Sequence, residues 1–138
     1  MPYPGEYITF PVHGSSLQAS NVTFTNSETI TDTITVQVVS GRQYNVRHCG
    51  QWTSSVSSDK ITSRIREDNV GGNQIQGGVF QVVTANYGVW APLEVVWTAG
   101  ITISKTFVVT GIRTSGSGTC QRTAASGTQS AFLVEQWV

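Results

Sequence analysis

The stretch that decides the fold is Ser130-Ala131-Phe132-Leu133-Val134-Glu135-Gln136-Trp137-Val138, an apolar run that reaches the last residue of the sequence. Its aromatic and β-branched content predicts a β-strand. Chain ends usually fray unless something ties them down. We therefore expect this strand to be paired and buried, either inside its own sheet or against another copy of the chain. That requirement favours a closed all-β body and raises the expectation of an oligomer.

Two aromatic residues of this strand, Phe132 and Trp137, are candidates for an oligomer interface. They are five positions apart, so in a regular strand their side chains face opposite sides of the sheet. One is then expected to enter the core, and the other is the better candidate for a contact between subunits. The alternative is that both only fill the sandwich core.

Length and charge limit the classes of function. With 138 residues the chain suits one domain with a real core. Charged residues make up 12% and the formal net charge is zero, so no basic excess favours nucleic acid or a membrane surface. No run approaches the ~18 apolar residues of a membrane helix, and the first residues lack the basic start and apolar core of a secretory signal. We expect synthesis in the cytoplasm.

Prolines mark out the beginning of the chain. Pro2, Pro4 and Pro11 lie within the first twelve residues. Proline fixes φ and has no backbone donor, so this stretch suits an extended arm or an edge strand. The sequence predicts an extended arm over residues 1–12 and a single domain over residues 13–138.

Short strands separated by turns account for the rest of the chain. Residues 30–38 alternate clearly, with Ile30, Ile34, Val36 and Val38 on one face. Further strands are predicted over 43–54, 60–66, 74–84, 93–98, 101–104 and 105–114, and residues 119–125 are expected to form a hairpin with 105–114. About nine or ten strands with turns every 8 to 12 residues indicate an antiparallel jelly-roll β-sandwich of about 8–10 strands.

The two cysteines, Cys49 and Cys120, are compatible with one disulfide or with two buried thiols. Cytosolic synthesis favours the thiols. Together with His13 and His48 they show none of the close ligand spacing that zinc sites use. We therefore expect no metal site and no cofactor.

Catalytic groups are sparse in this sequence. There are two histidines and eight carboxylates, and no nucleophile elbow, so a Ser-His-Asp arrangement would arise only by accident of folding. His48 is adjacent to Cys49, but neighbouring strand residues point to opposite faces. We expect His48 to be packed or hydrogen-bonded in the core, and we expect the protein not to be an enzyme.

The acidic stretch of residues 67–69, followed by Gly71, Gly72 and Asn73, contains oxygen groups that could bind calcium. It lacks the alternating acidic ligands and the distal Glu of an EF-hand loop. A solvated hairpin connection is therefore the better prediction.

Exposed aromatics suggest one alternative function. Tyr87 and Trp90 lie in a segment bounded by glycine and proline, which is predicted to be a loop. Tryptophan has a large apolar face and one donor, so it can stack on a sugar as well as fill a core. The alternative hypothesis is a carbohydrate-binding or host-receptor-binding module that uses this loop.

Four segments together resemble a known family. They are Ser40-Gly41-Arg42-Gln43-Tyr44-Asn45-Val46-Arg47, Ser63-Arg64-Ile65-Arg66-Glu67-Asp68, Thr106-Phe107-Val108-Val109-Thr110 with Arg113-Thr114-Ser115-Gly116-Ser117-Gly118-Thr119, and Ala131-Phe132-Leu133-Val134-Glu135. In this order they resemble small jelly-roll domains in virion proteins of tailed bacteriophages. Such domains are similar in architecture to the C1q and tumour-necrosis-factor group.

The resemblance implies a homotrimeric β-sandwich of the virion, without catalytic activity, that binds major capsid or tail proteins. Because the domain is nearly the whole chain, it favours a stand-alone head-decoration protein or an accessory (minor) tail protein. Many weak contacts would suffice for attachment, since a trimer has three attachment points. The chain departs from the family pattern at Cys49 and Cys120, where ordinary apolar strand residues are expected.

Overall fold

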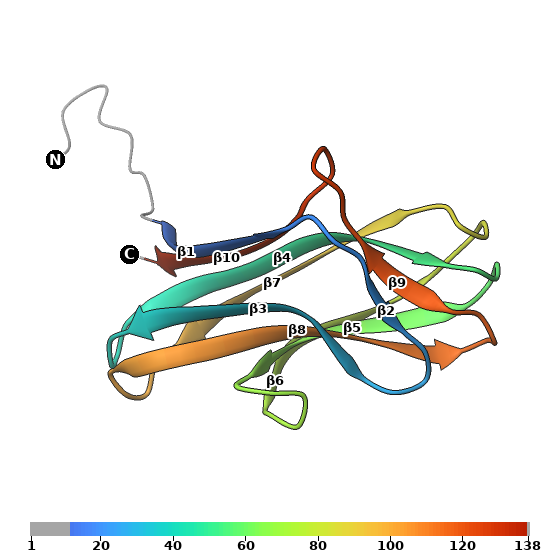
Figure 1. The fold of residues 1–138 in the computed structure, drawn as a ribbon. Coiled ribbons are helices and arrows are strands. Elements are labelled where there is room, and N and C mark those ends of the chain that lie inside the picture. The colour runs from blue at the N-terminus through green and yellow to red at the C-terminus, as the bar shows by residue number, and fades with distance from the viewer. Residues whose placement is uncertain (1–11, 138) are drawn as a thin grey trace, which may run out of the picture.

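The computed structural model describes residues 12–137, which form ten β-strands in two antiparallel sheets (Figure 1). The strands are β1 (Val12–Gln18), β2 (Val22–Phe24), β3 (Thr29–Val38), β4 (Gln43–Ser54), β5 (Lys60–Glu67), β6 (Gln74–Gln81), β7 (Val89–Thr98), β8 (Ile103–Ser115), β9 (Cys120–Thr123) and β10 (Ser130–Trp137). The prediction of an all-β antiparallel sandwich is confirmed. Of the predicted N-terminal arm, residues 1–11 lie outside the described residues, and Val12 begins β1.

The strand order is that of a jelly roll. In the first sheet, here called sheet A, β4 pairs with β7 on one side and with β10 and then β9 on the other. Strand β1 pairs with β10, and β2 pairs with β9. The second sheet, sheet B, has the order β3-β8-β5-β6. Each sheet is thus four strand positions wide. Most pairs of consecutive strands belong to different sheets, as in two interlocked Greek keys.

Alternating side chains from both sheets fill the space between them. The fully buried aromatic residues are Tyr44, Trp52, Phe107 and Phe132. Some of these rings pack edge to face, as in the pair Trp97 and Phe107, whose ring centroids are 5.1 Å apart, and others are tilted, as in the pair Tyr44 and Trp97. Burial of each such side chain stabilises the fold by roughly 1.5–3 kcal/mol. The two sheets are therefore held together chiefly by this apolar layer.

One predicted hairpin is wrong. Strand β9, within residues 119–125, pairs with β2 and β4 in sheet A, whereas β8 belongs to sheet B. The turn between β8 and β9 crosses from one sheet to the other. In it the buried carboxylate of Asp59 accepts hydrogen bonds from the backbone N–H groups of Ser117 and Gly118. The predicted separate strand over 101–104 is also wrong, since β8 begins at Ile103 and continues without a break.

A bulge in β3 changes which of its side chains enter the core. The register with β8 shifts between Ile30 and Asp32. Ile30, predicted on the apolar face, is consequently 39% exposed, while Thr31 and Asp32 are both buried. A bulge adds one residue to a strand and shifts its alternation by one position. Here the shift turns Ile30 outward and buries Thr31, next to Asp32, which is in phase with Ile34 and also faces inward.

The acidic stretch after β5 forms the connection to β6, as predicted. Lys105 Nζ lies 3.0 Å from Glu67 Oε1 and 2.9 Å from Asp68 Oδ2. The two carboxylates therefore pair with a cation of β8. Residues 12–137 contain no helix long and apolar enough to cross a membrane.

Candidate functional site

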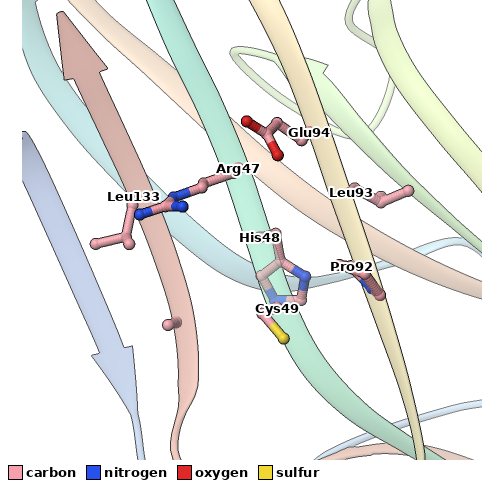
Figure 2. Close-up of a pocket in the computed structure, with 8 residues that line it drawn as sticks. Arg47, His48, Cys49, Pro92, Leu93, Glu94 and Leu133 are labelled. Carbon is pink, nitrogen blue, oxygen red and sulfur yellow. The ribbon is translucent and has the colours of Figure 1, made fainter.

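The outer face of sheet A contains a hollow of about 200 Å³ (Figure 2). Its lining comes from three neighbouring strands: Arg47, His48 and Cys49 of β4, Pro92, Leu93 and Glu94 of β7, and Ala131 and Leu133 of β10. His48 and Leu93 are buried and belong to the inner side of the sheet. The other six are outward positions of their strands.

Strand register explains why the surface is hollowed at this point. Ala131 lies opposite Cys49, and Cys49 lies opposite Pro92. On the far side of β10, Leu17 of β1 lies opposite Ala131 and is 58% exposed. These four residues, here called the apolar row, cross the full width of the sheet. Three of them are small, so the surface sinks between the larger side chains on either side.

Charged side chains border the hollow at one end. Arg47 Nη2 donates to Glu135 Oε1 over 2.7 Å, and Asn45 Nδ2 donates to Glu94 Oε1 over 2.7 Å. Figure 2 shows Arg47 and Glu94 at one end and the Cys49 sulfur at the other. Because both acidic groups already have partners, the apolar floor remains the feature that a ligand would contact. Such an arrangement suits an apolar side chain.

The structure separates the two aromatic residues predicted to form a ligand loop. Trp90 lies in strand β7 rather than in a loop, opposite Gln51 of β4, and is 48% exposed. Tyr87 lies in the turn before β7 and is 73% exposed. Neither lines the hollow. Trp90 nevertheless presents an accessible ring on the same face of sheet A.

Of the two predicted interface residues, Phe132 fills the core. Its side chain is fully buried, and its ring packs edge to face on His48 at 5.9 Å between centroids. Phe132 is therefore no longer a candidate for a contact between subunits, because its side chain has no solvent-exposed area. Trp137 is the last described residue of β10, where it pairs with Gln43 of β4.

Both cysteines are free thiols, so the disulfide alternative is wrong. Cys120 is buried, and burial raises the pKa of its thiol. Cys49 is exposed, which differs from the prediction that both thiols are buried. The strands explain why they cannot meet: Cys120 faces the core opposite Ser54, and Cys49 faces outward five residues earlier in β4. Opposite faces of a sheet cannot be bridged by one S–S bond.

Sequence reasoning missed a polar cluster in the centre of the sandwich. His48 Nε2 donates to Asp32 Oδ2 over 3.1 Å, and Arg122 Nε donates to the same oxygen over 3.0 Å. Ser130 Oγ lies 2.9 Å from His48 Nε2. All four side chains are buried. The prediction that His48 is a hydrogen-bonded core residue is confirmed.

The cluster brings Ser130, His48 and Asp32 together, yet its geometry differs from that of a catalytic triad. An ionised carboxylate only accepts hydrogen bonds, so Nε2 carries the proton and the Ser130 hydroxyl accepts from it. A base needs a free lone pair toward the serine and its carboxylate on the other ring nitrogen. His48 Nδ1 has no hydrogen-bond partner among residues 12–137. In this arrangement His48 cannot take a proton from Ser130.

The charges of the cluster are matched in the core. Burial by itself raises the pKa of Asp32, but the hydrogen bond from His48 and the positive charge of Arg122 lower it more. The pKa of Asp32 therefore lies below its ordinary value of 3.8. Arg122 also donates to the carbonyl oxygens of Ser20 at 2.8 Å and Thr31 at 2.9 Å. The cluster thus joins sheet A to sheet B by charge-assisted hydrogen bonds.

Comparisons with known proteins give a fold and no family. No protein-family model matches the sequence, and no curated protein matches it. Among solved structures it is similar to the insecticidal delta-endotoxin Cry8Ea1 from Bacillus thuringiensis, with a TM-score of 0.51 and 17% identity over 83% of this chain and 19% of the toxin chain. It is similar to a chain of infectious bursal disease virus, Gx strain, with a TM-score of 0.50 and 11% identity over 99% of this chain and 35% of the viral chain.

A CBM4 structure matches at a TM-score of 0.45 and 8% identity, over 93% of this chain and 92% of the other. The chain spans about a fifth of the toxin chain and about a third of the viral chain. At these identities the likeness concerns the fold alone: this chain has a jelly-roll sandwich that also occurs within longer proteins, one of them viral.

Proposed function

We propose that the protein is a non-enzymatic structural protein of a bacteriophage virion, which acts as a homotrimer in head decoration or as an accessory tail protein. The observation that supports this best is the apolar row on the outer face of sheet A. An outward sheet face is ordinarily polar, and contiguous exposed apolar side chains mark surfaces that bind other macromolecules. The resemblance of four sequence segments to virion jelly-roll domains gives the partner class.

The interior supports a rigid packing role. Its buried polar groups pair with one another: Asp32 Oδ2 accepts hydrogen bonds from His48 and from Arg122, and all three side chains lie away from solvent. The one hollow described above has an apolar floor and no pair of groups arranged for proton transfer. A module of this kind would act through its surface.

Two measurements test this proposal. Sedimentation equilibrium of the purified protein should give three times the chain mass of 14.9 kDa. Added to particles of the phage that encodes it, the protein should co-sediment with heads or tails and should saturate at a fixed number of copies. A monomer that leaves both kinds of particle unlabelled would contradict the proposal.

A second candidate function, binding of a carbohydrate or host receptor, is supported by Trp90. Trp90 is 48% exposed and lies opposite Gln51 in the register of β7 and β4, so a stacking face has a hydrogen-bonding residue as its cross-strand neighbour. Val96 is a matched control, because it lies on the same strand and face and is 46% exposed. Glycan binding that disappears in Trp90→Ala and persists in Val96→Ala would support this function. No glycan signal in either variant or in the unchanged protein would remove it.

A further inference from the structure

The hollow of the apolar row lies open in the described part of the chain. Cys49 at its floor is exposed, and Leu17 at the end of the row is 58% exposed. A partner that covered this surface would gain roughly 25 cal/mol of binding free energy for each Å² of apolar area removed from water. The hollow is therefore suited to an apolar occupant of a few side chains.

The first eleven residues of the sequence have the matching chemistry. Residues 7–10 read Tyr-Ile-Thr-Phe, and Glu6 is the one charged side chain between Met1 and Pro11. Ile8 and Phe10 are two positions apart and share one face of an extended chain, so both can enter a hollow formed by residues as small as Ala131 and Cys49. This segment, here called the arm, is joined directly to β1 of sheet A.

The direction of β1 carries the arm away from the hollow of its own subunit. Val12 pairs with Glu135, and Leu17, later in the same strand, pairs with Ala131 beside the hollow. At Val12 strand β1 therefore points away from the hollow, toward the end of β10. Phe10 precedes a proline, which restricts it to extended conformations and disfavours an immediate reversal.

The arm is long enough to reach another subunit. Eleven extended residues span roughly 36 Å, whereas the eight residues of β10 span about 26 Å. An arm that leaves the edge of one sandwich can thus extend over most of the length of a neighbouring sheet.

We propose that the hollow binds the arm of a neighbouring copy of this chain, with Ile8 and Phe10 covering the apolar row, so that the subunits exchange arms. This inference rests on the proposed homotrimer and names a contact that holds it together. Each subunit offers one arm and one hollow, so three copies close a ring in which every hollow is filled.

The exposed thiol of Cys49 gives a direct test. In Ile8→Cys, mild oxidation with diamide should join the introduced thiol to Cys49 of the next subunit, and a non-reducing gel should show covalent dimers and a closed covalent trimer. Cys120 is buried and stays reduced. The control Ile8→Cys with Cys49→Ser should yield no covalent trimer. A disulfide within one chain, or no disulfide with Cys49, would overturn arm exchange.

A second measurement covers the case in which that variant does not fold. Replacing Ile8 and Phe10 by serine should raise the reaction rate of Cys49 with Ellman's reagent severalfold, because the hollow is uncovered. Val79→Ser, a change at a 64% exposed residue of sheet B, should leave the rate unchanged. Equal rates in all three proteins would overturn the inference. The mass of the unchanged protein is measured separately. A trimer without arm cross-links would contradict only the exchange of arms, whereas a monomer would contradict the proposed homotrimer as well.

Discussion

Asp32 of β3 and His48 of β4 join the two sheets through a hydrogen bond of 3.1 Å between side chains that are fully shielded from solvent. A buried charge is tolerated only when it is paired and hydrogen-bonded. Asp32 meets this condition because Arg122 donates to the same carboxylate oxygen over 3.0 Å. The polar centre of the sandwich therefore depends on a single acidic residue.

Asp32→Asn should destabilise the protein by about 3–5 kcal/mol, because it leaves the Arg122 charge buried without its counterion. The control is Asp68→Asn, which removes a carboxylate that is 59% exposed and should cost at most about 1 kcal/mol. Urea denaturation followed by tryptophan fluorescence measures both. Equal free energies of unfolding for the two variants would show that the cluster does not hold the sheets together.

Stability should fall in acid. The pKa of Asp59 is lowered: burial alone raises it, but hydrogen bonds from Ser54 and from the backbone N–H groups of Gly118 and Ser117 lower it more. The folded protein therefore binds this proton less readily than the unfolded chain. Its contribution is complete above the ordinary value of 3.8 and disappears as pH falls through the lower folded value. The pKa of Asp32 is lowered in the same sense.

The measurement is the free energy of unfolding between pH 7 and pH 2. We expect a plateau above about pH 5 and a steep decline below about pH 4. Asp59→Asn should start lower and decline less steeply, since it lacks one of the groups that must be protonated. A parallel decline in both proteins would contradict the assignment to Asp59.

Gly111→Ala should destabilise the core by about 1–3 kcal/mol through overpacking. A Cβ atom at Gly111 would lie 2.8 Å from the Trp52 ring and 2.9 Å from the Phe24 ring. Gly100→Ala is the matched control, because nothing lies within 4 Å of a Cβ atom there. Thermal denaturation compares the two. A melting temperature for Gly111→Ala equal to that of the control would mean that the rings move aside freely.

Removing residues 136–138 should abolish the oligomer or the fold. The deletion takes away the pairing of Gln136 with Tyr44 and of Trp137 with Gln43, at the end of β10 where β1 begins. Light scattering and circular dichroism of the truncated protein measure the two consequences. An unchanged, stable assembly would contradict the importance assigned to this strand.

The alternation of side chains predicted much of the fold. Tyr44, Val46 and His48 face the core while Arg47 faces outward, as the alternation of residues 43–54 indicates. The same pattern contained an overlooked sign of the polar cluster: Asp32 stands in phase with Ile34 and is therefore directed inward. A charged residue at an inward-facing position of a strand indicates that it has a buried partner. Which residue is that partner depends on contacts between distant parts of the chain.

The remaining features depend on contacts distant in sequence. Arg122 is hydrogen-bonded to Asp32, 90 positions away in the sequence. The Asp59 carboxylate accepts hydrogen bonds from the backbone of the turn at Ser117 and Gly118. No local pattern distinguishes that crossing turn from a hairpin. The hollow likewise depends on the register that places Ala131, Cys49 and Pro92 side by side, although each residue alone is unremarkable on a strand.

The molar mass of the purified protein in solution tests the central claim most directly. Light scattering coupled to gel filtration, over a hundredfold range of loading concentration, should give a constant value of three times 14.9 kDa. A value of one chain mass at every concentration would contradict the homotrimer.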